Sequence, residues 1–305
     1  MKGQEIEPSG VLIINKPQGL TSHDVVGKIR KLYGTRRVGH TGTLDPLATG
    51  VLVILIGRAA KAAEYLVCDE KCYRATLTLG LTTDTEDITG KILTQSDIIP
   101  EQNKVLDACR KFTGKIKQTP PMYSALKVGG KKLVDLAREG IEIERAARVI
   151  EIFSLECEPT DNKTEYTLCV KCSSGTYIRT LCADIGKRLG CGGVMATLER
   201  RDAGGFSILE SHTVAELEAM SEEERFSLLK PTESLFEELP RVVLPEFYEK
   251  LCRNGCEIYQ KKIKTSFATG EKVRLYGKNG VFFALGEVRE YPDGSALKAI
   301  KIFDI

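Results

Sequence analysis

Several features on which other classes of protein depend are scarce or missing in this chain of 305 residues. It has three histidines, and none has the paired nucleophile of a hydrolase triad: His23, His40 and His212. No apolar run reaches the roughly 18 residues that indicate a membrane-spanning helix. Residues 1–5 lead into no apolar segment of the kind that directs export. We therefore expect a cytoplasmic protein without a membrane segment.

Nucleotide-binding and calcium-binding motifs are also missing. Residues 128–132 (VGGKK) and 39–42 (GHTG) contain glycines, but neither has the Gly-x-x-x-x-Gly-Lys-Ser/Thr spacing of a P-loop. Residues 84–90 (DTEDITG) contain carboxylates at a spacing that differs from that of a calcium loop. A polar loop is the better interpretation of that stretch, and the sequence does not indicate use of ATP, GTP or calcium.

The ten cysteines do not have the spacing of a metal site. In a cytoplasmic protein of this length they are expected to be reduced thiols. Cys169 and Cys172 lie in an alternating stretch typical of a strand, where residues three apart face opposite sides. Two other pairs lack the compact double-pair pattern of structural zinc modules: Cys68 with Cys72, and Cys252 with Cys256. We therefore expect no metal.

The net charge is low, at +2, but it is distributed unevenly along the chain. Residues 1–60 contain eight Lys and Arg against four Asp and Glu, and residues 241–305 contain twelve against eight. Residues 203–240 contain two against nine. This pattern is typical of a protein in which two faces meet phosphate while a third stays in solvent. Ordinary solvated surface charge is the alternative.

The most informative stretch that is present reads VGHTGTLDPLATGVL, at residues 38–52. Its glycines let a ligand approach the main chain closely, and Pro46 keeps the preceding Asp45 out of the helical region. Residues 51–56 are an unbroken apolar run, which predicts a fully buried strand. We therefore expect Asp45 to lie in an ordered loop beside the core. An aspartate that only braces a turn is the alternative.

The patterns of strand and helix alternate along the first 200 or so residues. Strands are predicted at residues 11–15, 72–79, 149–157 and 164–172. Helices are predicted from the capping residues 21–24 to Gly34, at residues 58–67 and 105–112, and from residue 178 to the C-terminal stop at Gly190. Because no βαβ nucleotide signature occurs, we predict an α+β fold, with helices flanking a mixed sheet.

A change in the sequence pattern near residue 240 predicts a domain boundary. Residues 210–238 contain two short helical patterns, and prolines follow at positions 240 and 245. Beyond them, short β-type runs at residues 273–276, 281–288 and 297–303 alternate with turn signals. We predict a first domain at residues 1–240, with an insertion at about 115–150, and a small β-rich domain at 241–305. A purely structural end-cap is the alternative for the second domain.

Four stretches of the chain resemble motifs of one enzyme family. The run at residues 38–52 resembles the catalytic motif of the TruB family of tRNA pseudouridine synthases. Three others are similar to further motifs, in the family's order: GVLIINKPQGLTS at 10–22, PPMYSALKVGGK at 120–131 and SGTYIRTL at 174–181. The resemblance implies the pseudouridine synthase fold for residues 1–240, with an RNA-facing insertion. It also implies a PUA-like RNA-binding domain at residues 241–305.

The resemblance implies a role for individual residues. Asp45 matches the catalytic carboxylate, which acts at the sugar as nucleophile or base, and Arg179 matches its ionic partner. Tyr73 matches the tyrosine that stacks on the target uracil and can take a proton. The other expected substrate and RNA contacts are His40 near the flipped nucleotide, Tyr177 and Leu198 as pocket walls, and Lys16 and Arg37 beside the catalytic loop.

The implied reaction is the isomerisation of the T-loop uridine at tRNA position 55 to pseudouridine, with no metal or organic cofactor. We expect the chain to bind the T-arm of tRNA, to need no protein partner and to be a monomer. One alternative is a guide-RNA-dependent synthase of the dyskerin kind, which usually has extra surface for protein partners. The other is an RNA-binding folding factor in which Asp45 is structural.

The chain departs from the family pattern at several positions. Val194 stands where members usually have histidine, and Glu199 stands where a basic residue is common. Ala147 and Val149 lie where prolines are frequent, so the resemblance says less about the detailed structure of the insertion. None of these departures involves the residues expected to carry the chemistry.

Overall fold

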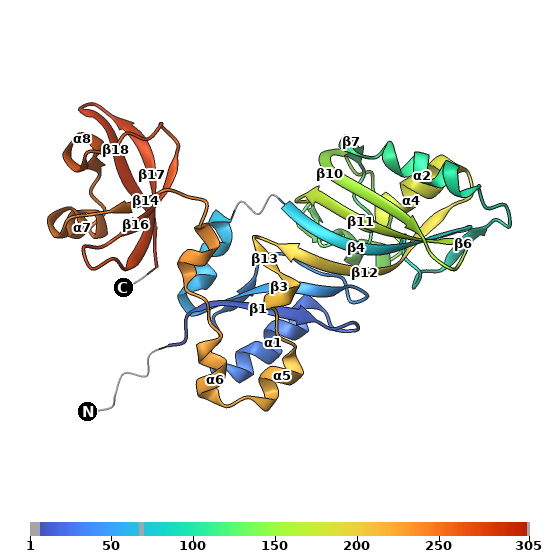
Figure 1. Cartoon of the computed structure of the whole chain (residues 1–305), viewed down its shortest axis with the longest axis horizontal. Coiled ribbons are helices and arrows are strands. Elements are labelled where there is room, and N and C mark those ends of the chain that lie inside the picture. The colour runs from blue at the N-terminus through green and yellow to red at the C-terminus, as the bar shows by residue number, and fades with distance from the viewer. Residues whose placement is uncertain (1–6, 67–69, 304–305) are drawn as a thin grey trace.

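The computed structural model describes residues 7–66 and 70–303 and contains two larger sheets, set side by side along the molecule (Figure 1). The first has nine strands and carries most of the chain, and the second has five and lies at the C-terminal end. Helices flank the first sheet, so the predicted α+β fold with a β-rich C-terminal domain is confirmed. Val67, at the predicted end of a helix, and Cys68 lie outside the described residues.

The nine-stranded sheet runs in the order β1-β3-β12-β4-β11-β10-β7, with β2 paired to β3 and β13 paired to β12. Its strands are β1 (Gly10–Lys16), β2 (Val38–His40), β3 (Thr49–Ile56), β4 (Glu70–Leu79), β7 (Gly114–Gln118), β10 (Arg148–Pro159), β11 (Glu165–Ser173), β12 (Gly193–Ala203) and β13 (Phe206–Ser207). All pairs are antiparallel except β3 with β12. That parallel pairing is short, since it joins only Glu199 to Thr49 and Arg200 to Gly50.

The central strand β12 was not predicted from the sequence. Its pairing with β4 has two register shifts, between Met195 and Thr197 and between Arg200 and Asp202. Each irregularity interrupts the alternation of apolar and polar residues that identifies a strand. Arg200 further obscures the pattern, because this charged residue faces the interior and is 2% exposed.

Among the described residues, this part of the chain has six α-helices; most were predicted, and most pack on one face of the large sheet. They are α1 (Ser22–Leu32), α2 (Gln102–Arg110), α3 (Leu133–Arg138), α4 (Ile178–Leu189), α5 (Val214–Ala219) and α6 (Glu222–Ser227). Thr21 caps α1 in a capping box with Asp24, and Gly190 ends α4 in a left-handed conformation with φ of 78°. The helix predicted at residues 58–67 is instead a 3-10 helix, η1 (Gly57–Tyr65).

Short elements complete the first part of the chain. They are the hairpins β5 (Leu81–Thr83) with β6 (Ile92–Gln95) and β8 (Lys127–Val128) with β9 (Lys131–Lys132), and the 3-10 helices η2 (Ile208–Glu210) and η3 (Thr232–Phe236). The segment between β7 and β10 contains the second hairpin and α3. It is the region expected to be an insertion.

The five-stranded sheet has the order β14-β16-β17-β18-β15. Its elements are β14 (Arg241–Val243), α7 (Glu246–Arg253), β15 (Ile258–Tyr259), α8 (Gln260–Ile263), β16 (Lys272–Tyr276), β17 (Phe282–Tyr291) and β18 (Gly294–Ile302). This sheet has its own core. Leu285 and Phe303 lie outside that core and belong to a second cluster, with Val11 and Val53 of the large sheet. Phe236 joins the two parts, with its ring 6.1 Å from that of Phe303.

Membrane-spanning helices and metal clusters are both absent from the described ranges. No helix in residues 7–66 and 70–303 has both the length and the apolar character needed to cross a bilayer. In the same ranges, no group of three or more His, Cys, Asp or Glu side chains is arranged to hold a metal ion. Cys169 is exposed and Cys172 is buried, as expected for residues on opposite sides of β11.

A substitution at Gly50 tests how much the parallel pairing of β3 with β12 contributes to stability. It has a φ of 98°, and a Cβ added there would lie 2.2 Å from the backbone oxygen of Arg200. Because backbone must move to relieve this clash, we expect Gly50→Ala to lower the free energy of unfolding by about 2–4 kcal/mol. Gly27→Ala is the control, since that helical position is open and alanine should stabilise α1 slightly. Denaturant unfolding measures both, and a Gly50→Ala protein as stable as wild type would contradict the account.

Candidate active site

A cavity of about 320 Å³ opens where the two halves of the large sheet meet. Five separate segments line it: residues 42–45 before β3, Lys71 and Tyr73 of β4, residues 124–126 of the insertion, residues 175–179 at the start of α4, and Leu198 and Arg200 of β12. Asp45, Tyr73, Tyr177, Arg179 and Leu198, all expected from the sequence to form the site, are therefore brought together.

Hydrogen bonds on both sides of Asp45 hold its loop. The hydroxyl of Ser22 accepts from the backbone N–H of Leu44 at 2.9 Å, and the N–H of Ala48 donates to the carbonyl of Asp45 at 3.1 Å. Leu44 is buried, whereas the Asp45 side chain is 38% exposed. The loop thus anchors one side chain in the core and leaves the next facing the cavity.

The guanidinium of Arg179 lies directly against this carboxylate. Arg179 Nε is 3.0 Å from Asp45 Oδ2, and the arginine side chain is 5% exposed. Its two terminal nitrogens donate to backbone carbonyls, Nη1 to Thr85 at 3.0 Å and Nη2 to Tyr123 at 2.8 Å. Asp87 Oδ2 lies 3.8 Å from Nη1. A buried cation needs such partners, and together they fix the direction in which it meets Asp45.

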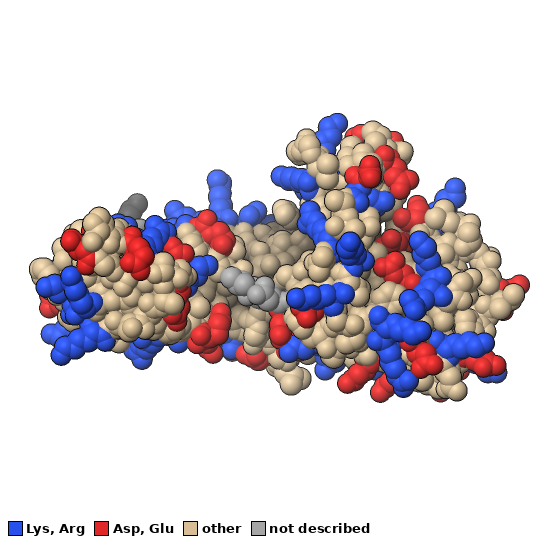
Figure 2. Space-filling view, turned by 90° about the horizontal axis from the view of Figure 1, so that it is seen from above, with Lys and Arg blue, Asp and Glu red and all other residues tan. Residues whose placement is uncertain are grey.

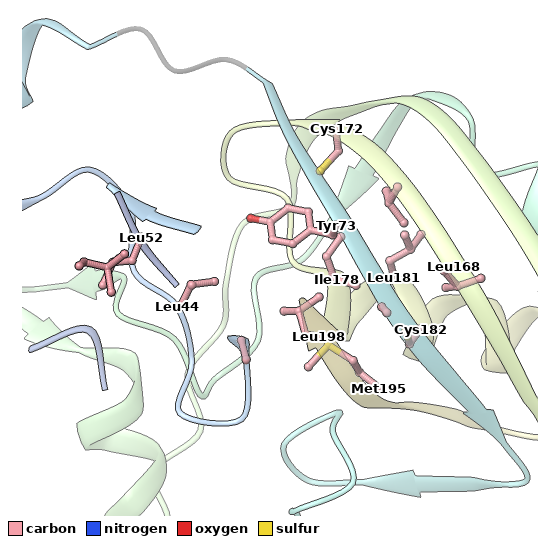
Figure 3. Packing of buried hydrophobic residues seen from close by; sticks show 14 of the residues in the cluster. Leu44, Leu52, Tyr73, Leu168, Cys172, Ile178, Leu181, Cys182, Met195 and Leu198 are labelled. Carbon is pink, nitrogen blue, oxygen red and sulfur yellow. The ribbon is translucent and has the colours of Figure 1, made fainter. Parts of the chain in front are cut away.

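Tyr73 forms an apolar wall of the cavity. Figure 3 shows its ring beside Ile178 and Leu198, with the hydroxyl pointing toward the segment that carries Leu44. Burial raises the pKa of Tyr73, which keeps the phenol protonated at neutral pH. A planar face and a protonated hydroxyl in one cavity suit the binding of a flat, polar ring.

Tyr177 is positioned by a pair of hydrogen bonds to one side chain. Its N–H donates to Gln118 Oε1 at 2.8 Å, and its carbonyl accepts from Gln118 Nε2 at 3.0 Å. Gln118 lies at the end of β7 and is 2% exposed, so the start of α4 is tied to the base of the insertion. Burial raises the pKa of Tyr177 as well.

Arg200 was not predicted from the sequence. It lies at the floor of the cavity and supports the loop that carries Asp45. Its Nε donates to the carbonyl of Val51 at 2.7 Å, and its Nη2 donates to the carbonyl of Gly42 at 3.0 Å. This arginine therefore connects β12 to β3 and to the loop that carries Asp45. A signal was present, since Arg200 lies two residues after the expected pocket residue Leu198, and alternate residues of a strand share a face.

Three residues expected to contact RNA do not line the cavity: Lys16, Arg37 and His40. Lys16 is fully buried, and its Nζ donates to the carbonyls of Pro17 at 2.9 Å and Leu20 at 2.7 Å. Burial lowers its pKa to about 8, against the opposing effect of the Asp45 charge. The structure thus places Lys16 beneath the loop that carries Asp45, where its ammonium is buried away from RNA, and corrects that prediction.

His40 lies at the edge of the site, whereas Arg37 lies at the other end of β3, where its carbonyl accepts from the N–H of Gly57 at 2.7 Å. Arg37 is exposed and forms an ion pair of 2.9 Å with Glu7. The His40 ring lies 6.2 Å from that of His23, edge to face, and burial lowers the pKa of His40. A neutral imidazole beside residues 41–45 remains compatible with the predicted contact to a nucleotide.

The departures from the family pattern have different surroundings. Val194 is fully buried in β12, where it packs without a polar group to satisfy. Glu199 forms an ion pair of 3.1 Å with Arg201, and Val149 is 66% exposed on β10. Ala147 precedes β10 in a stretch without regular structure. None of these side chains lines the cavity.

Comparison with known proteins gives the family. Residues 30–178 match the model described as TruB family pseudouridylate synthase (N terminal domain), and residues 179–237 match the tRNA pseudouridylate synthase B C-terminal domain. A protein of Alkaliphilus oremlandii named tRNA pseudouridine synthase B is 47% identical over 88% of this chain and 89% of its own length. One of Clostridium kluyveri with the same name is 40% identical over 96% and 99%.

A solved structure has the same overall fold. The chain aligns with the structure titled "Crystal Structure of a Cbf5-Nop10-Gar1 Complex" at a TM-score of 0.73 and 25% identity, over 97% of this chain and 85% of the other. This chain therefore belongs to the TruB family of pseudouridylate synthases.

Proposed function

We propose that this chain isomerises the T-loop uridine at position 55 of tRNA to pseudouridine, acting alone and without a cofactor. The observation that carries the proposal is the 3.0 Å contact between Arg179 and Asp45, placed in a cavity with Tyr73. The names of the relatives support tRNA as the substrate. Those names do not state which uridine is modified or what each residue does, so both are part of the proposal.

The reaction begins with entry of the uridine into the cavity. The base must leave its stack, and Tyr73, Tyr177 and Leu198 offer the surfaces that replace its stacked neighbours. Stacking of a base on an aromatic ring contributes about 1–3 kcal/mol, which offsets much of the cost of extrusion from a loop. The cavity, at about 320 Å³, is large enough to admit a flipped base.

Asp45 then acts at the sugar, as nucleophile or as base. The bond between N1 of the base and C1′ of the ribose breaks, the uracil turns, and C5 forms a new bond to C1′. C5 loses its proton and N1 gains one, so atoms and electrons balance without any other reactant. Arg179 holds the carboxylate in one orientation during these steps, and the protonated Tyr73 hydroxyl lies in the same cavity.

The surrounding surface supports contacts with phosphate. Seen from above, the molecule has a depression between the C-terminal lobe at the left and an upright projection, and Lys and Arg gather on the flank of the projection that faces it (Figure 2). The insertion contributes exposed Lys127, Lys131 and Lys132, and the C-terminal domain contributes exposed Lys261 and Lys262. Such cations supply the sequence-independent part of RNA binding.

A guide-RNA-dependent enzyme is the second candidate, because the fold also aligns with Cbf5 in a complex with Nop10 and Gar1. The higher identity to proteins named tRNA pseudouridine synthase B supports a stand-alone enzyme. Purified protein that modifies unmodified tRNA without any other component would exclude the second candidate.

Asp45→Asn tests the catalytic role. The amide keeps the shape of the side chain but has neither its charge nor its basicity, so we expect the single-turnover rate to fall by roughly 10⁴-fold or more. Affinity for tRNA should stay within a few fold of wild type. Asp97→Asn, an exposed aspartate on the loop after β6, is the matched control and should keep the full rate. Loss of folding and binding together in Asp45→Asn would instead favour a structural aspartate.

Tyr73→Phe separates stacking from proton transfer. The ring remains, so binding of tRNA should be nearly unchanged, and the rate should fall by roughly 10²-fold or more if the hydroxyl moves a proton. Tyr166→Phe is the control, because Tyr166 is buried in the same sheet but does not line the cavity. Rapid-quench measurement of pseudouridine gives the rates. A wild-type rate in Tyr73→Phe would reject the acid-base role and leave stacking intact.

Replacing exposed lysines of the C-terminal domain tests whether it binds RNA. This test is cleaner than deletion of the domain, because deletion would expose the apolar cluster around Phe236. We expect replacement of Lys261, Lys262 and Lys278 by Gln to weaken tRNA binding. The slope of log affinity against log salt should fall by about 0.7–0.9 for each phosphate that a lysine no longer neutralises. The control replaces three exposed lysines from the first part of the chain: Lys104, Lys163 and Lys187. Equal salt slopes in both triple variants would contradict RNA binding by this domain.

A further inference from the structure

Glu86 has an unusual backbone conformation close to the ion pair of the site. It has a φ of 63°, and it is one of two non-glycine residues with positive φ in the parts of the chain described, the other being Lys264. An L-residue with a side chain rarely adopts this conformation, and glycine would adopt it without strain. A glutamate here therefore needs a reason that lies in its side chain.

The Glu86 side chain is attached to the start of helix α4. Thr180 Oγ1 donates a hydrogen bond of 2.5 Å to Glu86 Oε2, and Thr180 is 5% exposed. Thr180 directly follows Arg179 in the chain. Glu86 thus holds the residue next to the arginine that contacts Asp45.

The backbone around Glu86 is attached to strand β12. The carbonyl of Glu86 accepts from the N–H of Met195 at 3.1 Å, and the N–H of Ile88 donates to the carbonyl of Met195 at 3.0 Å. These bonds fix the turn from the side of the sheet while Thr180 fixes it from the side of the helix. The turn at residues 85–87 therefore has one defined place between the two.

The residues on either side of Glu86 hold Arg179 itself. The carbonyl of Thr85 accepts from Arg179 Nη1 at 3.0 Å, and Asp87 Oδ2 lies 3.8 Å from the same nitrogen. Asp87 Oδ1 in turn accepts from the hydroxyls of Thr85 at 2.9 Å and Thr89 at 2.6 Å. Two of the four groups around the guanidinium, the Thr85 carbonyl and the Asp87 carboxylate, are thus positioned by the turn, whose central residue is Glu86.

We infer that Glu86 is a positioning residue for the reaction: by accepting from Thr180 it clamps the turn at residues 85–87 to α4, and so aims Arg179 at Asp45. The inference rests on the proposed roles of Asp45 and Arg179. Glu86 does not line the cavity. Its effect is on geometry, where an error of about 1 Å in the placement of a reacting group costs on the order of 100-fold in rate.

The hydrogen bond needs an acceptor and does not need a charge. Burial raises the pKa of Glu86, and Asp184, on the next turn of α4, adds a like charge nearby. The hydrogen bond from Thr180 opposes the rise in pKa most, followed by the charges of Arg179 and Arg145. Because Thr180 donates through a neutral hydroxyl, the amide oxygen of a glutamine can take the place of the carboxylate oxygen.

The test compares three replacements of Glu86 in the full-length protein. Glu86→Gln keeps the acceptor, Glu86→Ala removes it, and Glu86→Gly removes it while relieving the backbone strain. We expect Glu86→Ala and Glu86→Gly to lower the single-turnover rate by roughly tenfold or more with tRNA affinity within about threefold of wild type. Glu86→Gln should keep the rate within about threefold. Glu86→Gly should be at least as thermally stable as Glu86→Ala, so that a loss of rate cannot be a loss of folding.

Thr180 supplies the matched pair. Thr180→Val should slow the reaction as Glu86→Ala does, Thr180→Ser should not, and the double variant Glu86→Ala with Thr180→Val should be no slower than either alone. Wild-type rates in Glu86→Ala and Glu86→Gly, or a Glu86→Gln as slow as Glu86→Ala, would overturn the inference.

Arg179→Lys separates this inference from the proposed function. If Arg179→Lys keeps the wild-type rate, the proposed role of the ion pair fails, and the inference about Glu86 fails with it. If Arg179→Lys is slow while all three Glu86 variants are fast, only the role of Glu86 is overturned.

Discussion

The contact between Arg179 and Asp45 is the interaction on which the rest of the site depends. A guanidinium that is 5% exposed is unfavourable unless each of its donors has a partner, and here two carbonyls and two carboxylates surround it. Three of these four partners lie at residues 85–87 and 123, far from Asp45 in the sequence. The fold therefore has to bring four segments together before the cation can meet the Asp45 carboxylate.

A second buried arginine supports the other side of the same loop. Arg200 donates to the carbonyls of Gly42 and Val51, and Gly50 lies close enough to Arg200 to exclude a Cβ. The short parallel pairing of β3 with β12 thus joins the two halves of the sheet at the floor of the cavity. Lys16 adds a third buried cation under the loop. The same hydrogen bonds therefore fix both the fold and the position of Asp45.

Much of this could be predicted from the sequence, for identifiable reasons. Strand β3 and helix α1 have patterns that depend on local residues alone, an unbroken apolar run and a capping box. The resemblance identified Asp45, Tyr73 and Arg179, which the structure places around one cavity. Strand β12 was missed because bulges interrupt its alternation, and Lys16 was misplaced because local sequence does not reveal burial of a lysine. The role of Arg200 depends on partners about 150 residues away.

The central claim is that Asp45 and Arg179 form the reacting site of an enzyme that acts alone on tRNA. The most direct measurement incubates the purified wild-type protein with unmodified tRNA in buffer containing a chelator, and maps pseudouridine at every uridine. We expect conversion at position 55, with no other component added. A folded protein that binds the tRNA but leaves position 55 as uridine would contradict it.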